Sequence, residues 1–253
     1  MIDFLAQACL WFTHKSFLIP FIIIGYFTFS KEIFCKALFI LLFSIMLNAY
    51  LKSLWQIPLS PALGKEGWSF PSGHMQTAFA FWGWIAWEFK QIWFMVLIIF
   101  LLVVIGFSLV HFGYHHCYDI FGAVGFGILS LIAYDALLRH FLVFKINLPG
   151  LGLLFFILAL PMIYLIPLSL PHLWIADGAL LGFSLGCILS PNEQRHNAVL
   201  KIIIAILGAY LIYKFFSFLR PFNSLKLINF VQFFLSSLWV SFVPQKIISI
   251  LQK

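Results

Sequence analysis

The chain has 253 residues, of which 63% are hydrophobic and only 9% are charged, and its mean hydropathy is +1.06. A soluble domain carries about 25% charged residues, so this composition excludes a soluble globular protein and indicates one embedded in a lipid bilayer. The formal net charge is +7, but the cations are scattered along the chain and give no support to a nucleic-acid-binding surface.

Apolar runs follow one another along almost the whole chain. The hydrocarbon core of a bilayer, about 30 Å thick, needs about 20 apolar residues for each helical crossing. Runs of about this length, with a shorter second one, lie at 33–55, 75–89, 91–110, 120–138, 148–169, 173–190, 198–219 and 227–243. Before them, residues 4–12 and 17–29 either form one broken crossing or leave 4–12 in the membrane interface. We therefore expect an all-α, polytopic membrane bundle of nine helices, give or take two.

Two features of the later runs concern packing. Gly178, Gly182 and Gly186 repeat every four residues, a spacing that places them on one face of a helix and favours close helix packing. Asp135 and Asp177 lie inside apolar runs. We expect these carboxylates to be paired internally or to mark helix ends, and we assign them no chemical role.

Unusual polar residues gather in two places, residues 48–74 and 108–119. The first includes "PSGH" (Pro71–His74) at the start of an apolar run, and the second reads "SLVHFGYHHCYD". Because a helical hairpin separates them, we expect both stretches at the same membrane face. Ionisable groups are costly in a bilayer and usually have a function or a partner.

The residue types in these stretches suit phosphate chemistry. His115 and Asp119 are four residues apart, so on a helix the carboxylate can hold one imidazole nitrogen and leave the other free to attack. Ser72 and Gly73 precede His74 at a predicted helix start, where free N–H groups and the helix dipole favour an anion. Zinc binding by the second stretch is an alternative, through His111, His115, His116, Cys117 and Asp119.

Together these residues resemble the type 2 phosphatidic acid phosphatase superfamily, which shares a helical core with vanadium haloperoxidases. The family has three motifs: K-x6-R-P, P-S-G-H and S-R-x5-H-x3-D. The second is intact here, the third is matched at Ser108, His115 and Asp119, and the first at Lys52. The sequence "SFPSGHMQ" is similar to a bacterial branch of membrane-associated members with extra C-terminal helices.

The resemblance implies a mechanism that needs no metal ion or other cofactor. His115 would attack phosphorus and form a phosphohistidine, oriented by Asp119, while His74 would protonate the leaving oxygen and then activate water. Lys52, the Ser72 hydroxyl and the Gly73 N–H would hold the phosphate oxygens, and Ser108 would line the same site.

The chain departs from the family at two arginines. Leu59 stands at the arginine position of the first motif, with Ser60 at its proline, and Leu109 stands at the arginine position of the third. Lys65 and His111 are candidate replacement cations, and an imidazole carries full charge only at mildly acidic pH. Losing two charged hydrogen bonds costs roughly 3–6 kcal/mol, which keeps other functions open.

We expect residues 1–145 to form a six-helix lipid phosphatase-like core and 146–253 to add helices to the same membrane domain. The larger share of the 15 Lys and Arg falls on one side of the membrane, which places the PSGH loop on the extracytoplasmic face of a bacterial inner membrane. The expected activity is hydrolysis of a membrane lipid phosphate monoester or diphosphate. Alternatives are a silent lipid-phosphate-binding or scaffolding protein and a lipid phosphotransferase or transporter. The sequence does not indicate an oligomeric state.

Overall fold

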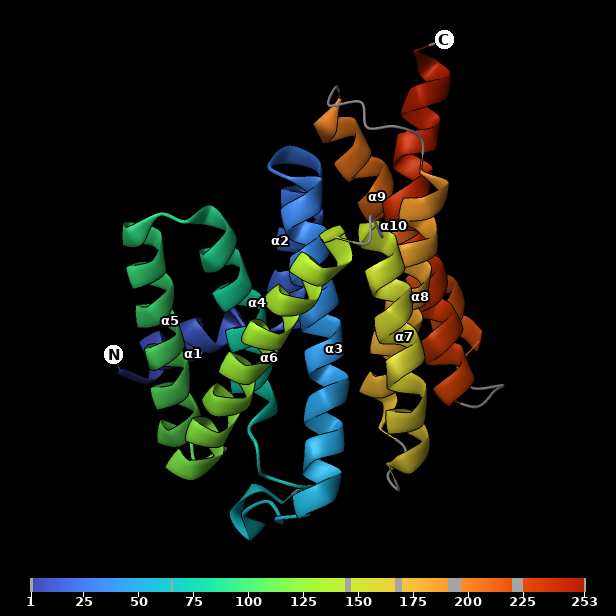
Figure 1. Ribbon diagram of the computed structural model, residues 1–253. Helices are drawn as coiled ribbons and strands as arrows, with labels where there is room; N and C mark the ends of the chain where they lie inside the picture. The colour runs from blue at the N-terminus through green and yellow to red at the C-terminus, as the bar shows by residue number, and fades with distance from the viewer. Residues whose placement is uncertain are drawn as a thin grey trace. The chain divides into compact units, whose positions relative to one another are not determined.

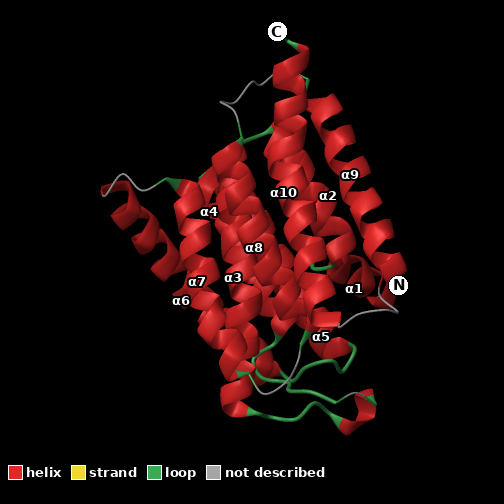
Figure 2. Ribbon diagram, turned by 90° about the vertical axis from the view of Figure 1, so that its right-hand side faces the viewer, coloured by secondary structure: helices red, strands yellow, loops and turns green. Residues whose placement is uncertain are grey.

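The computed structural model describes residues 2–64, 66–143, 147–166, 170–190, 197–219 and 225–252. Within these ranges it contains ten α-helices, one short 3₁₀ helix and no strand (Figure 2), which confirms the all-α fold. The helices are α1 (Ile2–Trp11), α2 (Lys15–Thr28), α3 (Lys31–Trp55), η1 (Pro61–Leu63), α4 (Gly73–Phe89), α5 (Ile92–His111), α6 (Cys117–Val143), α7 (Leu148–Leu165), α8 (Pro171–Leu189), α9 (Ala198–Leu219) and α10 (Leu225–Leu251).

Seven of the described helices are long and apolar enough to cross a membrane: α3 and α5 to α10. The pair α1 and α2, bent by 49° at the break between them, would make an eighth crossing. With 17 residues, α4 is just too short to count. These helices indicate a membrane-embedded protein, and their number lies within the range expected around nine.

Local residue chemistry explains several helix ends. The hydroxyl of Ser72 accepts a hydrogen bond from the N–H of Met75 and caps α4, and the side chain of Asn147 accepts one from Gly150 at the start of α7. The last helix, α10, continues through Pro244 to Leu251, whereas the apolar run predicted an end at 243. The proline therefore lies inside a helix whose apolar side chains continue beyond it.

The chain divides into two compact units. The first comprises residues 1–19 and 36–140, and the second comprises residues 20–35 and 141–253. The first boundary falls inside α2, at Pro20. The division expected at residue 145 remains a prediction. In the structure, residues 20–35 belong to the same compact unit as residues 141–253.

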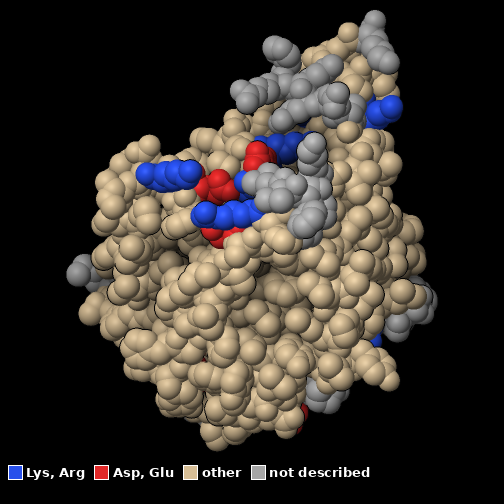
Figure 3. Space-filling view, viewed as in Figure 1, with Lys and Arg blue, Asp and Glu red and all other residues tan. Residues whose placement is uncertain are grey.

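In the first unit α5 packs against α4 and α1. Figure 1 shows that the loop from α3 to α4 and the turn from α5 to α6 lie at the same end of this unit. At the opposite helix ends Lys36 pairs with Glu88 at 3.0 Å, and Asp135 pairs with Arg139 at 2.8 Å. Most of the face in Figure 3 carries no charged side chain. The first unit therefore has one polar loop end and one end with ion pairs.

In the second unit α8 packs along α10, and the two helices run in the same direction (Figures 1 and 2). A methyl group added to Gly178 or Gly182 would collide with the backbone carbonyl of Phe230 or Phe234, respectively. The predicted packing role of these glycines is confirmed. Asp177 corrects an expectation, because it lies inside α8, it is buried, and neither carboxylate oxygen has a hydrogen-bond partner among the described residues.

Candidate active site

The two polar stretches meet at the loop end of the first unit. The backbone N–H of Ser72, in the PSGH turn, donates a hydrogen bond of 3.1 Å to the backbone carbonyl of Asp119, in the first turn of α6. The start of α4 is thereby held against the start of α6. The expectation that residues 48–74 and 108–119 share one end of the bundle is confirmed.

His115 faces Asp119 across one turn of chain. Its Nδ1 lies 3.4 Å from Oδ2 of Asp119, with only 8% of the imidazole and none of the carboxylate exposed. The same Oδ2 accepts a hydrogen bond of 2.9 Å from the N–H of His116, which fixes the carboxylate. At 3.4 Å the ring contact is longer than a normal hydrogen bond, as is common before substrate binds. This arrangement turns Nδ1 of His115 toward the carboxylate and leaves Nε2 for chemistry.

The surroundings of His115 keep its imidazole uncharged. Burial, first, and the positive charge of Lys52 lower the pKa of His115, Asp119 acts in the opposite direction, and the net result is a pKa of about 4. A neutral imidazole has a lone pair available at neutral pH, whereas a protonated one does not. The site therefore holds this histidine in the form that a nucleophile needs.

Lys52 reaches the same region from the end of α3. Its ammonium group donates a hydrogen bond to the backbone carbonyl of Trp68, in the loop that leads to the PSGH turn. The charge that influences His115 is therefore held on this loop by a backbone acceptor.

The PSGH turn presents free donors at the start of α4. Ser72 is fully buried; its carbonyl accepts the N–H of Gln76, and its hydroxyl accepts that of Met75. The N–H groups of Gly73 and His74 have no partner in the described part of the chain. The His74 side chain is exposed. Free N–H groups at a helix start bind anions well.

Residues 33–141 match the family model described as the PAP2 superfamily. This segment is similar to the PAP2 superfamily. It covers less than half of the chain and includes α4, α5, nearly all of α3 and α6, and both polar stretches. No curated protein and no solved structure matches the chain significantly. Members of the PAP2 superfamily are generally phosphatases, so the match supports a phosphoric ester hydrolase.

The two leucines at family arginine positions occupy different surroundings within residues 33–141. Leu109 is 1% exposed, and its carbonyl accepts the N–H groups of Tyr114 and His115 in the turn after α5. Leu59 is half-buried in the loop after α3, where its N–H donates to the carbonyl of Gly67. Of these two positions, only position 59, in the loop, is close enough to solvent for a charged side chain.

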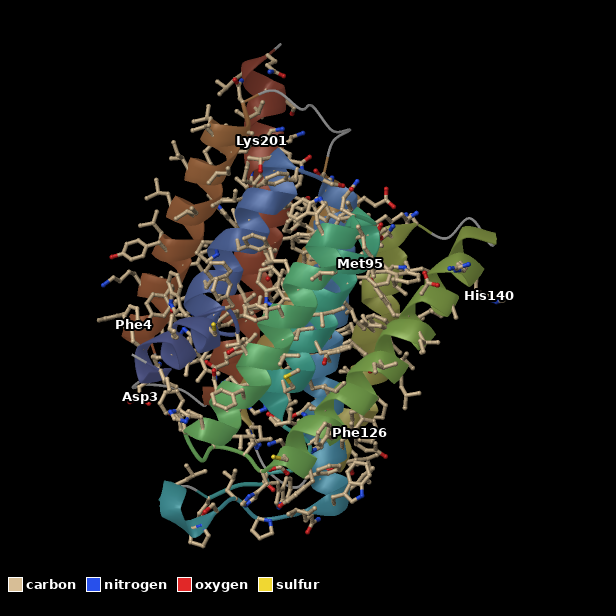
Figure 4. All side chains as sticks on the ribbon, turned by 90° about the vertical axis from the view of Figure 1, so that its left-hand side faces the viewer. Asp3, Phe4, Met95, Phe126, His140 and Lys201 are labelled. Atoms are coloured by element: carbon tan, nitrogen blue, oxygen red, sulfur yellow. The ribbon has the colours of Figure 1, made fainter. Side chains whose placement is uncertain are left out.

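Three other predicted site residues lie as follows. The buried hydroxyl of Ser108 donates to the carbonyl of Val104 within its own helix. His111 pairs with Asp3, with Nε2 2.7 Å from Oδ1; Figure 4 labels Asp3. Lys65 lies outside the described residues. Phosphate binding by these residues remains a prediction.

The histidines near α6 have separate partners. His111 faces Asp3, His115 faces Asp119, and the ring of His116 stacks on Tyr118 with centroids 5.4 Å apart. Among the residues that the structure describes, no group of three or more His, Cys, Asp or Glu side chains could hold a metal ion. The zinc alternative therefore receives no support from this geometry.

Sequence reasoning missed one polar residue of the site, Asn48. It lies one helical turn before Lys52 on α3, is buried, and donates hydrogen bonds to the carbonyl of Pro71 and the side chain of Gln76. The only available signal was its four-residue spacing from Lys52, which places both side chains on one helix face.

Proposed function

We propose that the protein is a membrane-embedded phosphatase that hydrolyses a lipid phosphate monoester or diphosphate through a phosphohistidine. The observation that carries this proposal is the imidazole of His115, oriented by the carboxylate of Asp119, at the same end of the first unit as Lys52 and the free N–H groups of the PSGH turn. A scaffold without catalysis has no need for this combination.

The proposed reaction has two steps at one phosphorus atom. Nε2 of His115 attacks phosphorus while His74 protonates the departing alcohol or phosphate oxygen, which leaves phosphate bound to nitrogen. His74 then removes a proton from water, the water oxygen attacks phosphorus, and the P–N bond breaks to restore His115. Lys52, the Ser72 hydroxyl and the N–H groups of Gly73 and His74 stabilise the charge that builds on the phosphoryl oxygens.

The proposed substrate is an amphiphile, since the domain lies among apolar membrane helices. We place the site on the extracytoplasmic face of a bacterial inner membrane, on the basis of the distribution of Lys and Arg between the loops. Lys65 and His111 remain the proposed replacements for the family arginines.

The test is phosphate release by the purified full chain from a panel of lipid mono- and diphosphates in the presence of chelator. We expect turnover that is inhibited by vanadate and lost in His115→Ala. His140→Ala is the matched control, because His140 lies near the opposite end of α6 (Figure 4). Equal release by the wild type and His115→Ala on every substrate would overturn the proposal.

A silent lipid-phosphate-binding protein is the second candidate, and the buried Leu109 at a family arginine position favours it. In that case vanadate or a lipid phosphate would raise the melting temperature of the protein while no substrate is turned over. Transfer of the phosphoryl group to an acceptor other than water would instead appear as phosphorylated acceptor without free phosphate.

A further inference from the structure

Asn48 connects α3 to both ends of the PSGH turn. Its Nδ2 donates to the carbonyl of Pro71 at 3.1 Å and to Oε1 of Gln76 at 2.8 Å. A backbone carbonyl can only accept, so Nδ2 must face Pro71 and the orientation of the amide is fixed. Its oxygen, Oδ1, must then lie on the other side, toward Gly73.

Gly73 packs directly against this oxygen. A methyl group added at Gly73 would lie 3.0 Å from Oδ1 of Asn48, which is tighter than ordinary van der Waals contact, and 3.7 Å from its Cγ, which is an ordinary contact. The backbone at Gly73 does not require glycine, because its φ is not positive, unlike those of Gly64, Gly67 and Gly113. Steric contact with the Asn48 side chain, and not backbone conformation, therefore favours glycine at position 73.

The two free N–H groups lie between the anchors of Asn48. Pro71 precedes them, Gln76 follows them by less than one turn, and Gly73 and His74 carry the free donors. A shift of the turn relative to α3 would move both donors. Since Lys52 is on the same face of α3 one turn later, the same shift would also separate the donors from its charge.

We propose that Asn48 is a positioning residue of the phosphate site and that Gly73 is glycine because Asn48 occupies the space beside it. The side-chain amide fixes the N–H groups of Gly73 and His74 relative to Lys52, so that all three donors converge on one phosphoryl group. The catalytic part of this proposal rests on the proposed phosphatase function; the packing part does not.

A double-mutant cycle tests the proposal with four full-length proteins: wild type, Asn48→Ala, Gly73→Ala and the double variant. We expect each single change to lower kcat/KM by about tenfold or more, because small displacements of positioned groups have large effects on rate. In the double variant Oδ1 is gone and the methyl group fits. The fall in kcat/KM of the double variant should therefore be no larger than that of the more impaired single variant.

A different result is expected if glycine serves only the close approach of phosphate. Removing Asn48 would then bring no relief, and the two losses would multiply in the double variant, which would overturn the proposal. A merely structural role of Asn48 would lower the melting temperature but leave kcat unchanged in the folded fraction. Positioning of donors instead lowers kcat and weakens vanadate inhibition together.

The melting temperatures of the same four proteins provide a readout that needs no substrate. Coupling between Asn48→Ala and Gly73→Ala in this measurement supports the packing part even if no lipid is turned over, and additivity overturns it. Gly125→Ala is the control glycine change, since no atom lies within 4 Å of an added methyl group there. Absence of turnover with coupled melting temperatures would count against the phosphatase and not against Asn48.

Discussion

The carboxylate of Asp119 lies 3.4 Å from Nδ1 of His115, on the side of the imidazole ring away from Nε2. This relationship predicts a large effect of Asp119→Asn, because an amide can present an N–H to the ring and favour the wrong tautomer. We expect phosphate release to fall by about a hundredfold or more, measured as kcat on the best lipid phosphate. Asp135→Asn is the matched control in the same helix, and an equal loss there would contradict a specific role for Asp119.

The charge of Lys52 predicts a shift in the pH profile. Its positive charge helps to lower the pKa of His115 to about 4, so the imidazole is neutral down to pH values well below its usual range. Removing a nearby like charge raises the pKa of a histidine, and Lys52→Met should therefore move the acidic limb of kcat/KM to higher pH. An unchanged limb, whatever the fall in overall rate, would show that Lys52 has no electrostatic influence on His115.

Restoring arginine should have opposite effects at the two leucine positions. Leu59→Arg, in the half-buried loop, should strengthen vanadate inhibition by about tenfold or more, the value of one charged hydrogen bond. Leu59→Met is the control. Leu109→Arg would place a guanidinium in a buried position, and we expect a lower melting temperature, since an unpaired buried charge is costly. If Leu109→Arg instead kept the wild-type melting temperature and strengthened vanadate inhibition, position 109 would be able to hold a guanidinium, which contradicts this prediction.

The glycine contacts between α8 and α10 predict a stability difference between two alanine substitutions. Gly182→Ala places a methyl group against the carbonyl of Phe234, which cannot move without displacing α10. We expect a clear fall in the melting temperature. Gly125→Ala meets open space and should be neutral or stabilising, because alanine favours a helix by about 1 kcal/mol over glycine. Equal effects of the two changes would argue against close packing through Gly182.

Helix positions could be predicted well from the sequence because long apolar runs determine them. The run at 198–219 coincides with α9, and the run at 91–110 differs from α5 by one residue at each end. The pairing of His115 with Asp119 could also be predicted, since it needs only four residues of local geometry. Local periodicity and motif spacing are sufficient for features of this kind.

Contacts between distant segments could not be predicted in the same way. His111 pairs with Asp3, 108 residues earlier. Asn48, on α3, donates hydrogen bonds to Pro71, before α4, and to Gln76, on α4. These contacts depend on how far each helix is rotated about its axis, and no local pattern specifies that rotation. The same limit applies to Asp177, because the lack of a hydrogen-bond partner for its oxygens in the described part of the chain becomes visible only once its neighbours are placed.

The PSGH turn and the Lys36–Glu88 pair lie at opposite ends of the same helices. A bundle of membrane length keeps these ends about 30 Å apart, so in the proposed lipid phosphatase His115 would meet head groups from one leaflet only. Lipid phosphates produced in the other leaflet would have to cross the bilayer before hydrolysis. Turnover in intact vesicles would then depend on lipid translocation as well as on chemistry, and detergent would abolish that dependence.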